Sequence, residues 1–126
     1  SLPKIVNDVK NVLIKFDKPK QEPDNRQEWI NLASLVTVYS DILLGQIIYY
    51  ESKTPGYNNL DMFQRYNVSI QDEMLPQFIL FKNYSRNIIV YQDTIDALKM
   101  GTWLIYNSIY LGCDGCILQF DELVSQ

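Results

Sequence analysis

Apolar side chains in this chain occur in short groups that polar loops separate. The first group recurs at helical spacing through residues 2–9, and a continuous apolar run over residues 12–16 follows it. We therefore predict a short helix that leads into a buried strand. Residues 17–25 then contain two prolines, five charged side chains and no apolar side chain, which predicts a solvated loop.

The same alternation of helix and strand continues through the middle of the chain. Apolar residues at i, i+3 and i+4 spacing predict an amphipathic helix over about 25–39. Residues 42–50 are nearly all apolar, a pattern typical of a strand that is covered on both faces, as in a parallel sheet. A short helix near residues 60–66 follows, and the polar loop after it ends at Pro76, directly before the next strand.

The last third of the chain predicts a hairpin and a long helix. Strands at 78–81 and 88–91 are separated by a short polar segment, which favours a β-hairpin. The helix is predicted from about Asp93 or Thr94 to Asn107 or Ser108, with Asp93 and Asp96 capping its first turn. One apolar stripe is expected to face the core: Ile95, Leu98, Thr102, Ile105 and Ile109. A second stripe, Trp103, Tyr106 and Tyr110, is either ordinary core or a face buried against another domain or a partner subunit.

The order of these elements is helix, strand, helix, strand, helix, strand, strand, helix. Alternation in the first half predicts right-handed βαβ connections and parallel strands, and the hairpin adds an antiparallel edge. The fold class is therefore α/β, a sandwich with a mixed central sheet and helices on both faces.

Composition narrows the chemistry that this fold could perform. The 126 residues suffice for one main domain, and their net charge of −4 argues against binding to a nucleic-acid backbone. No apolar run is long enough to span a membrane, so we expect no membrane insertion. The sequence has no histidine, the commonest general base and metal ligand. The carboxylate pairs Asp93/Asp96 and Asp72/Glu73 have no partnering base, and we expect neither enzymatic activity nor a cofactor or metal.

The two cysteines of the chain form a single Cys-x-x-Cys motif, Cys113–Cys116. Such a pair can be redox-active or half of a zinc site, but zinc would need ligands from a second copy, because the chain holds no other cysteine or histidine. The pair follows the predicted end of the last helix, where the negative end of the helix dipole disfavours a thiolate. The remaining alternative is a local disulfide, or two partly buried thiols, behind that helix.

The order of elements, with a proline immediately before the first hairpin strand, resembles the thioredoxin fold. The segment 75–83 resembles the part of thioredoxins that contains their cis-proline, which implies a cis bond between Leu75 and Pro76. The alternative is a trans proline that only begins the strand. Redox-active thioredoxins carry Cys-x-x-Cys in the loop after the first core strand and bury an acid in that strand. Here residues 17–26 contain no cysteine, and Lys15 stands at the place of the acid.

A closer resemblance is to the redox-inactive, PDI-related chaperones of the endoplasmic reticulum, the Windbeutel type of escort protein. The similar segments are 12–17 for the first core strand, 41–44 for the second, 103–104 with 110–116 for the last helix and linker, and 120–123 for the start of a helical C-terminal domain. This resemblance implies a thioredoxin-like domain over residues 1–112, without the family's leading strand. Residues 113–126 would be the linker and the start of a truncated helical C-terminal domain.

The resemblance also implies a function. We expect a non-catalytic chaperone or escort in the lumen of the endoplasmic reticulum that binds partly folded secretory proteins and is a homodimer at full length. Its client-binding residues would be Lys20 and Glu22, which replace two tyrosines of the family, together with Met74, Leu75 and Pro76. The alternatives are a thiol–disulfide oxidoreductase that uses Cys113 and Cys116, and a purely structural dimerisation module.

Overall fold

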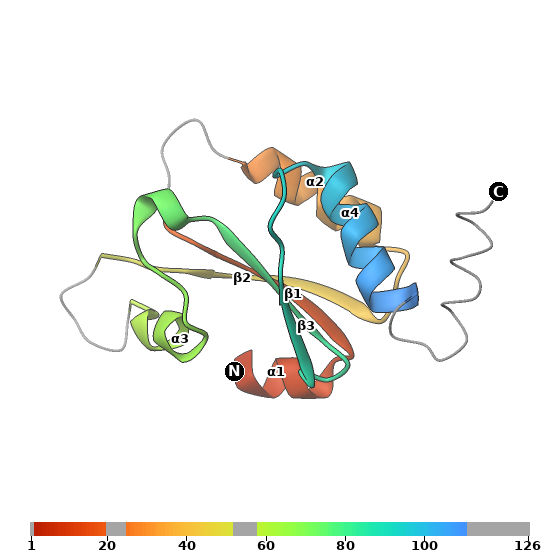
Figure 1. Ribbon diagram of the computed structural model, residues 1–126, viewed down its shortest axis with the longest axis horizontal. Helices are drawn as coiled ribbons and strands as arrows, with labels where there is room; N and C mark the ends of the chain where they lie inside the picture. Colours follow the sequence, from red (N-terminus) through yellow and green to blue (C-terminus); the bar gives the residue numbers. More distant parts are fainter. Residues whose placement is uncertain (1, 20–24, 52–57, 111–126) are drawn as a thin grey trace.

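The computed structural model describes residues 2–19, 25–51 and 58–110, and it contains the eight predicted elements in the predicted order (Figure 1). Two short turns, η1 and η2, were not anticipated from the pattern. The elements are α1 (Leu2–Asp8), β1 (Asn11–Asp17), α2 (Arg26–Val36), β2 (Ile42–Ile48), α3 (Leu60–Arg65), the 3₁₀ turn η1 (Asp72–Met74), β3 (Gln77–Lys82), β4 (Asn87–Val90), α4 (Ala97–Ile105) and the π-helical turn η2 (Tyr106–Tyr110).

The four described strands form one mixed sheet in the order β2-β1-β3-β4. β1 is parallel to β2 and antiparallel to β3, and β3 continues into β4 as an antiparallel hairpin. Asn83, Tyr84 and Ser85 turn this hairpin with φ angles of 54°, 57° and 62°, all in the left-handed region. The mixed sheet of the predicted fold class is confirmed.

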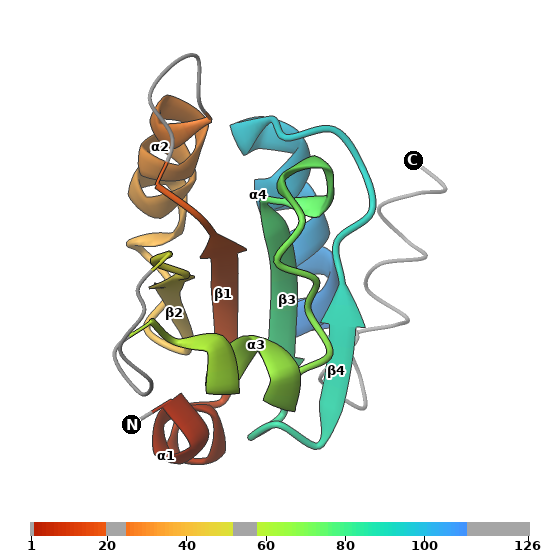
Figure 2. The ribbon, with the colours of Figure 1, turned by 90° about the vertical axis from the view of Figure 1, so that its left-hand side faces the viewer.

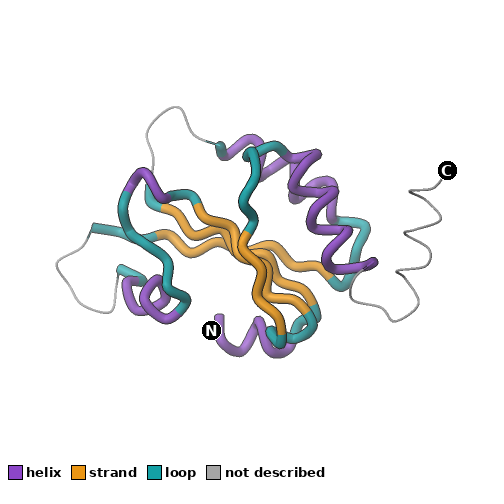
Figure 3. The backbone as a smooth tube through the Cα atoms, in the orientation of Figure 1, coloured by secondary structure: helices purple, strands orange, loops and turns teal. Residues whose placement is uncertain are grey.

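Helices cover both faces of the sheet. α2 and α4 lie on one face, and α1 and α3 lie on the other (Figures 1 and 2). The tube view shows how far the strands twist between these two helical layers (Figure 3). The strands alternate their side chains between the layers, so each face has its own apolar cluster.

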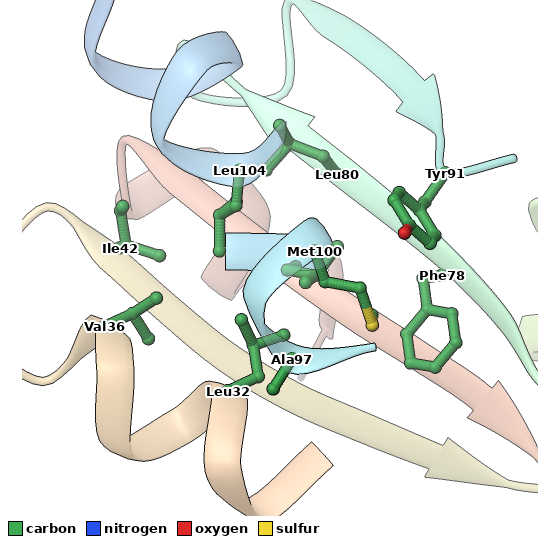
Figure 4. Close-up of a cluster of buried hydrophobic side chains, with 10 residues drawn as sticks. Leu32, Val36, Ile42, Phe78, Leu80, Tyr91, Ala97, Met100 and Leu104 are labelled. Carbon is green, nitrogen blue, oxygen red and sulfur yellow. The ribbon is translucent and has the colours of Figure 1, made fainter. Parts of the chain in front are cut away.

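The cluster beneath α2 and α4 is built by side chains from both helices and the sheet (Figure 4). Leu32 of α2 and Met100 and Leu104 of α4 are fully buried there, above Leu13 and Leu80 of the central strands. The cluster on the α1/α3 face centres on Phe16, whose ring contacts that of Phe63 edge-on at a centroid distance of 5.3 Å. These contacts place β1 at the centre of the domain, where all seven of its residues are buried.

β2 differs from the prediction. Its apolar sequence suggests a strand covered on both faces, but it is the edge of the described sheet and has a neighbour on one side only. Leu43 is therefore 43% exposed and Gln46 is exposed, while Ile42 is buried. The apolar run thus predicted correctly a strand with a parallel partner, and overestimated how completely the strand is covered.

The orientation of α4 also corrects the prediction. The helix begins at Ala97 with Asp96 as its N-cap, whose side chain accepts a hydrogen bond of 2.9 Å from the backbone N–H of Lys99. Its core face consists of Ala97, Met100, Gly101 and Leu104. Of the stripe expected to face the core, Leu98 is 70% exposed and Thr102 is exposed, whereas Ile95 packs against the α2/α4 cluster. Ala97 and Gly101 are small, so a pattern based on large apolar residues did not include them. The predicted core face of the helix was therefore displaced from the observed one.

Within the described residues, the structure has no helix long and apolar enough to cross a membrane.

Candidate functional site

The segment predicted to contact clients joins η1 to β3. The peptide bond between Leu75 and Pro76 is cis, as predicted. Met74 is 55% exposed and Pro76 is partly exposed, whereas the side chain of Leu75 is buried in the cluster on the α1/α3 face. Leu75 therefore anchors the segment to the core, and Met74 and Pro76 supply its accessible side-chain surface.

The carboxyl end of β1 lies beside this segment, because the antiparallel register pairs Phe16 with Gln77, the residue after Pro76. Lys15 and Asp17 are both buried at this end of β1. Their side chains form an ion pair in which Lys15 Nζ lies 3.6 Å from Asp17 Oδ2. A paired cation thus occupies the place where the resemblance to redox-active thioredoxins would put a buried acid.

A groove of about 550 Å³ opens where β1 and β2 end and α2 begins. Trp29 forms part of its wall; the indole packs on Phe78 at a centroid distance of 5.5 Å and lies 6.0 Å from Lys15 Nζ. Ile30 is 49% exposed on the same helix. The groove offers indole and aliphatic surface beside the ammonium groups of Lys15 and Lys18. It is lined by Lys15, Asp17, Lys18, Pro19, Arg26, Trp29, Ile30, Gln46 and Ile48.

Lys18 connects this groove to the segment that carries Met74. Its Nζ donates a hydrogen bond of 2.9 Å to Asp72 Oδ1 in η1 and lies 3.5 Å from Glu51 Oε1, just after β2. The ammonium also lies 5.6 Å from the ring centroid of Tyr49. The hydrogen bond to Asp72 raises the pKa of Lys18 above its ordinary value, so this amine stays charged at neutral pH.

Several predicted site residues lie outside the described residues. These are Lys20 and Glu22 of the loop after β1, and Cys113 and Cys116 of the Cys-x-x-Cys motif. The side chain of Tyr110 is likewise outside the description. The structure therefore brings Met74 and Pro76 together with the end of β1, and the roles of the other residues stay predictions.

The predicted interdomain or partner face is partly core. The ring of Trp103 packs on that of Tyr91 at a centroid distance of 5.1 Å, at the margin of the α2/α4 cluster. Burial raises the pKa of Tyr91, whose hydroxyl donates to the carbonyl of Thr94 at 2.5 Å. Trp103 and Tyr106 also line an apolar groove of about 790 Å³ on the outer side of α4, beside the exposed Leu98.

Sequence patterns missed three acidic residues that organise this part of the molecule. Asp72 and Glu51 both approach Lys18, and Glu28 reaches α4, where its Oε2 accepts a hydrogen bond of 3.0 Å from the backbone N–H of Ala97. Their partners are distant in the sequence, so no local pattern could have revealed them.

The described part of the chain contains no group of three or more acidic, cysteine or histidine side chains arranged to hold a metal ion. The acids at the candidate site are spread among lysine partners, and the site offers ammonium groups, an indole and a methionine. This arrangement offers both apolar and charged contacts to a bound molecule.

Comparison with known proteins places this chain in a family. Residues 1–114 match the family model described as "ERp29, N-terminal domain". The chain belongs to this family. The ERp29 N-terminal domain family is PDI-related and has a thioredoxin-like fold, which confirms the resemblance drawn from the sequence.

Solved structures support the same fold for this member of the ERp29 N-terminal domain family. The J-Trx1 fragment of ERdj5 matches with a TM-score of 0.61 and 14% identity, over 84% of this chain and 47% of that one. A zinc-bound form of human ERp44 matches with a TM-score of 0.61 and 13% identity, over 82% of this chain and 28% of that one. Thioredoxin f2 of Chlamydomonas reinhardtii matches with a TM-score of 0.58 and 11% identity, over 84% and 89% of the two chains.

The chain thus spans less than half the length of the ERdj5 fragment and of ERp44. At these identities the likeness concerns the fold alone.

Proposed function

We propose that this chain is a redox-inactive, non-catalytic chaperone or escort domain that binds partly folded secretory proteins in the lumen of the endoplasmic reticulum. Its membership in the PDI-related ERp29 N-terminal domain family supports the compartment and the general role. The client surface in this proposal consists of Met74 and Pro76, with the loop after β1 that contains Lys20 and Glu22.

The observation that carries the proposal is the end of β1. A thioredoxin-like fold performs thiol chemistry with cysteines at the start of the helix after β1 and with a buried acid nearby. Here residues 17–26 contain no cysteine, and Lys15 is paired with Asp17 inside the domain. This end of the fold has accessible surface: Met74 is 55% exposed, and Lys18, which holds Asp72 of the same turn, lines the groove walled by Trp29. Exposed methionine adapts its shape to varied apolar partners, which suits a protein with many clients.

The test measures binding to a reduced, unfolded secretory protein such as lysozyme, by fluorescence anisotropy and by suppression of its aggregation. Met74→Ser removes the exposed side chain of the proposed surface. Ile88→Ser is the matched control, because Ile88 is also 55% exposed but lies in β4 near the opposite end of the hairpin. We expect Met74→Ser to raise Kd at least threefold, about the effect of losing roughly half of a methionine contact. We expect Ile88→Ser to leave Kd unchanged, and equal effects of the two variants would refute the assigned surface.

The homodimer implied by the resemblance is part of the same proposal. Sedimentation equilibrium of the chain would measure it. Dimerisation without client binding would favour a purely structural dimerisation module instead. Turnover in insulin reduction that Cys113→Ser abolishes would favour the oxidoreductase alternative.

A further inference from the structure

Lys18 occupies an unusual position for a residue in a polar loop. Its side chain is 14% exposed, while its two acidic partners, Glu51 and Asp72, are 79% and 83% exposed. The lysine side chain is therefore the least exposed member of this cluster, and both of its carboxylate partners are open to solvent. Two contacts fix the lysine at the end of β1: its backbone N–H donates to Asp17 Oδ1 at 2.8 Å, and its Nζ lies over the ring of Tyr49.

These contacts join three segments that are distant in the sequence. Lys18 follows β1, Glu51 follows β2, and Asp72 begins η1, which carries Met74 two residues later. The hydrogen bond between Lys18 and Asp72 spans 54 positions. In Figure 1 the green η1 turn accordingly lies at the end of the sheet where β1 ends. One side of η1 is anchored through Leu75 in the core, and the other is held by this ammonium.

We propose that Lys18 is a positioning residue for the client surface: by holding Asp72 it keeps η1 in place and presents Met74 beside the groove at the end of β1. The inference rests on the proposed client-binding function. It adds a role for a residue that need not touch the client, and it makes client affinity depend on ionic strength. Because both carboxylates are exposed, salt screens their attraction to Lys18, so high salt loosens η1. A loosened segment must be ordered again when a client binds, and this ordering lowers affinity.

The experiment uses the full chain and a fluorescent, end-capped peptide of leucine, phenylalanine and serine that carries no charge. Because the probe is neutral, salt cannot act on direct charge contacts with it. Kd is measured at low and at high sodium chloride concentration for wild type, Lys18→Met, Lys18→Arg, Asp72→Asn and the double variant Lys18→Met/Asp72→Asn. Lys4→Met removes an exposed lysine of α1 and serves as the charge-matched control.

We expect Lys18→Met to raise Kd at low salt about threefold, the effect of losing two partly exposed ion pairs. Asp72→Asn should act in the same direction, the double variant should add nothing to Lys18→Met, and Lys18→Arg should retain most of the affinity. The affinity of wild type should fall at high salt to that of Lys18→Met, whose own affinity should not change with salt. A merely structural lysine would shift the urea midpoint without producing this salt pattern.

The outcomes separate the two proposals. If wild type does not bind the peptide, or if Met74→Ser has no effect, the proposed client surface fails. If Met74→Ser weakens binding while Lys18→Met and Asp72→Asn do not, the positioning role is wrong and the client surface stands. If Lys18→Met unfolds, Asp72→Asn and Glu51→Gln decide the question, because both acids are exposed and neither substitution disturbs the core.

Discussion

The buried ion pair between Lys15 and Asp17 makes a quantitative prediction about stability. The pair lies at the end of the central strand, with 9% and 7% of the two side chains exposed. Replacing one member leaves a buried charge without its partner, which is more damaging than replacing both. We therefore expect Lys15→Met and Asp17→Asn to be strongly coupled in a double-mutant cycle.

The geometry sets the size of this coupling. At 3.6 Å and an effective dielectric constant of about 20, two unit charges attract by about 5 kcal/mol before desolvation is counted. Loss of one partner of a buried pair destabilises proteins by about 3–5 kcal/mol. Two local contacts moderate that figure here. Asp17 also accepts a hydrogen bond of 2.8 Å from the backbone N–H of Lys18, and the Lys15 ammonium lies 6.0 Å from the ring of Trp29.

We accordingly expect Asp17→Asn to lower the free energy of unfolding by about 2–3 kcal/mol and Lys15→Met by about 1–2 kcal/mol. The double variant should lose about 2 kcal/mol, which is less than the sum of the single losses, so the coupling energy should be about 1–3 kcal/mol. The loss from Lys15→Met is smaller because Asp17 keeps its backbone donor and a methionine suits the apolar part of the site.

Urea unfolding followed by circular dichroism measures these values, with unchanged m values confirming that the unfolding reaction is the same. Lys4→Met and Asp8→Asn form the control cycle, because these residues are exposed and one helical turn apart on α1. That pair should couple by at most about 0.5 kcal/mol. The coupling of the buried pair should also persist at high salt, because buried charges are screened little. A coupling no larger than that of the control, or one that salt abolishes, would refute the reasoning.

Three further predictions concern other parts of the domain. Gly101→Ala should stabilise the chain by about 0.5–1 kcal/mol in urea unfolding, because a Cβ at this position in α4 would meet Leu35 and Leu32 at 3.6 and 3.7 Å, ordinary contact distances; a loss of stability would contradict this. Burial lowers the pKa of Lys82, which pairs with no acid among the described residues. At a pH between this lowered pKa and the pKa of an unfolded lysine, the unfolded chain binds more protons than the folded chain. The free energy of unfolding should therefore rise with pH in this range. Lys82→Met should remove this rise and add about 1 kcal/mol at pH 7, as measured by urea unfolding across pH. In an insulin-reduction assay, wild type and Cys113→Ser should both match the protein-free control.

The order of the elements could be predicted from the sequence because, in most of them, the apolar side chains that form the local pattern are the ones buried in the core. β1 is the clearest case: its continuous apolar run becomes a fully buried central strand. The cis-proline segment and the mixed sheet were also predicted correctly, since the hairpin and the proline lie in one short stretch of chain. Where the orientation of an element depends on small residues, the pattern fails. The core face of α4 includes Ala97 and Gly101, and an expectation based on large apolar residues selected a neighbouring stripe that contains the exposed Leu98 and Thr102.

The candidate site likewise combines features that neighbouring residues predict with contacts between segments that are distant in the sequence. Met74 and Pro76 could be identified as candidate client contacts from one short stretch of sequence. The burial of Leu75 between them depends on how the segment after η1 packs into the cluster on the α1/α3 face. Lys18 belongs to a segment rich in charge and proline, a composition that predicts solvated side chains. Its enclosure follows from the arrangement of β1, β2 and η1, which brings Glu51 and Asp72 to one ammonium. The charges that organise this end of the fold are therefore a property of its topology, and substitution of those charges tests the topology and the proposed function together.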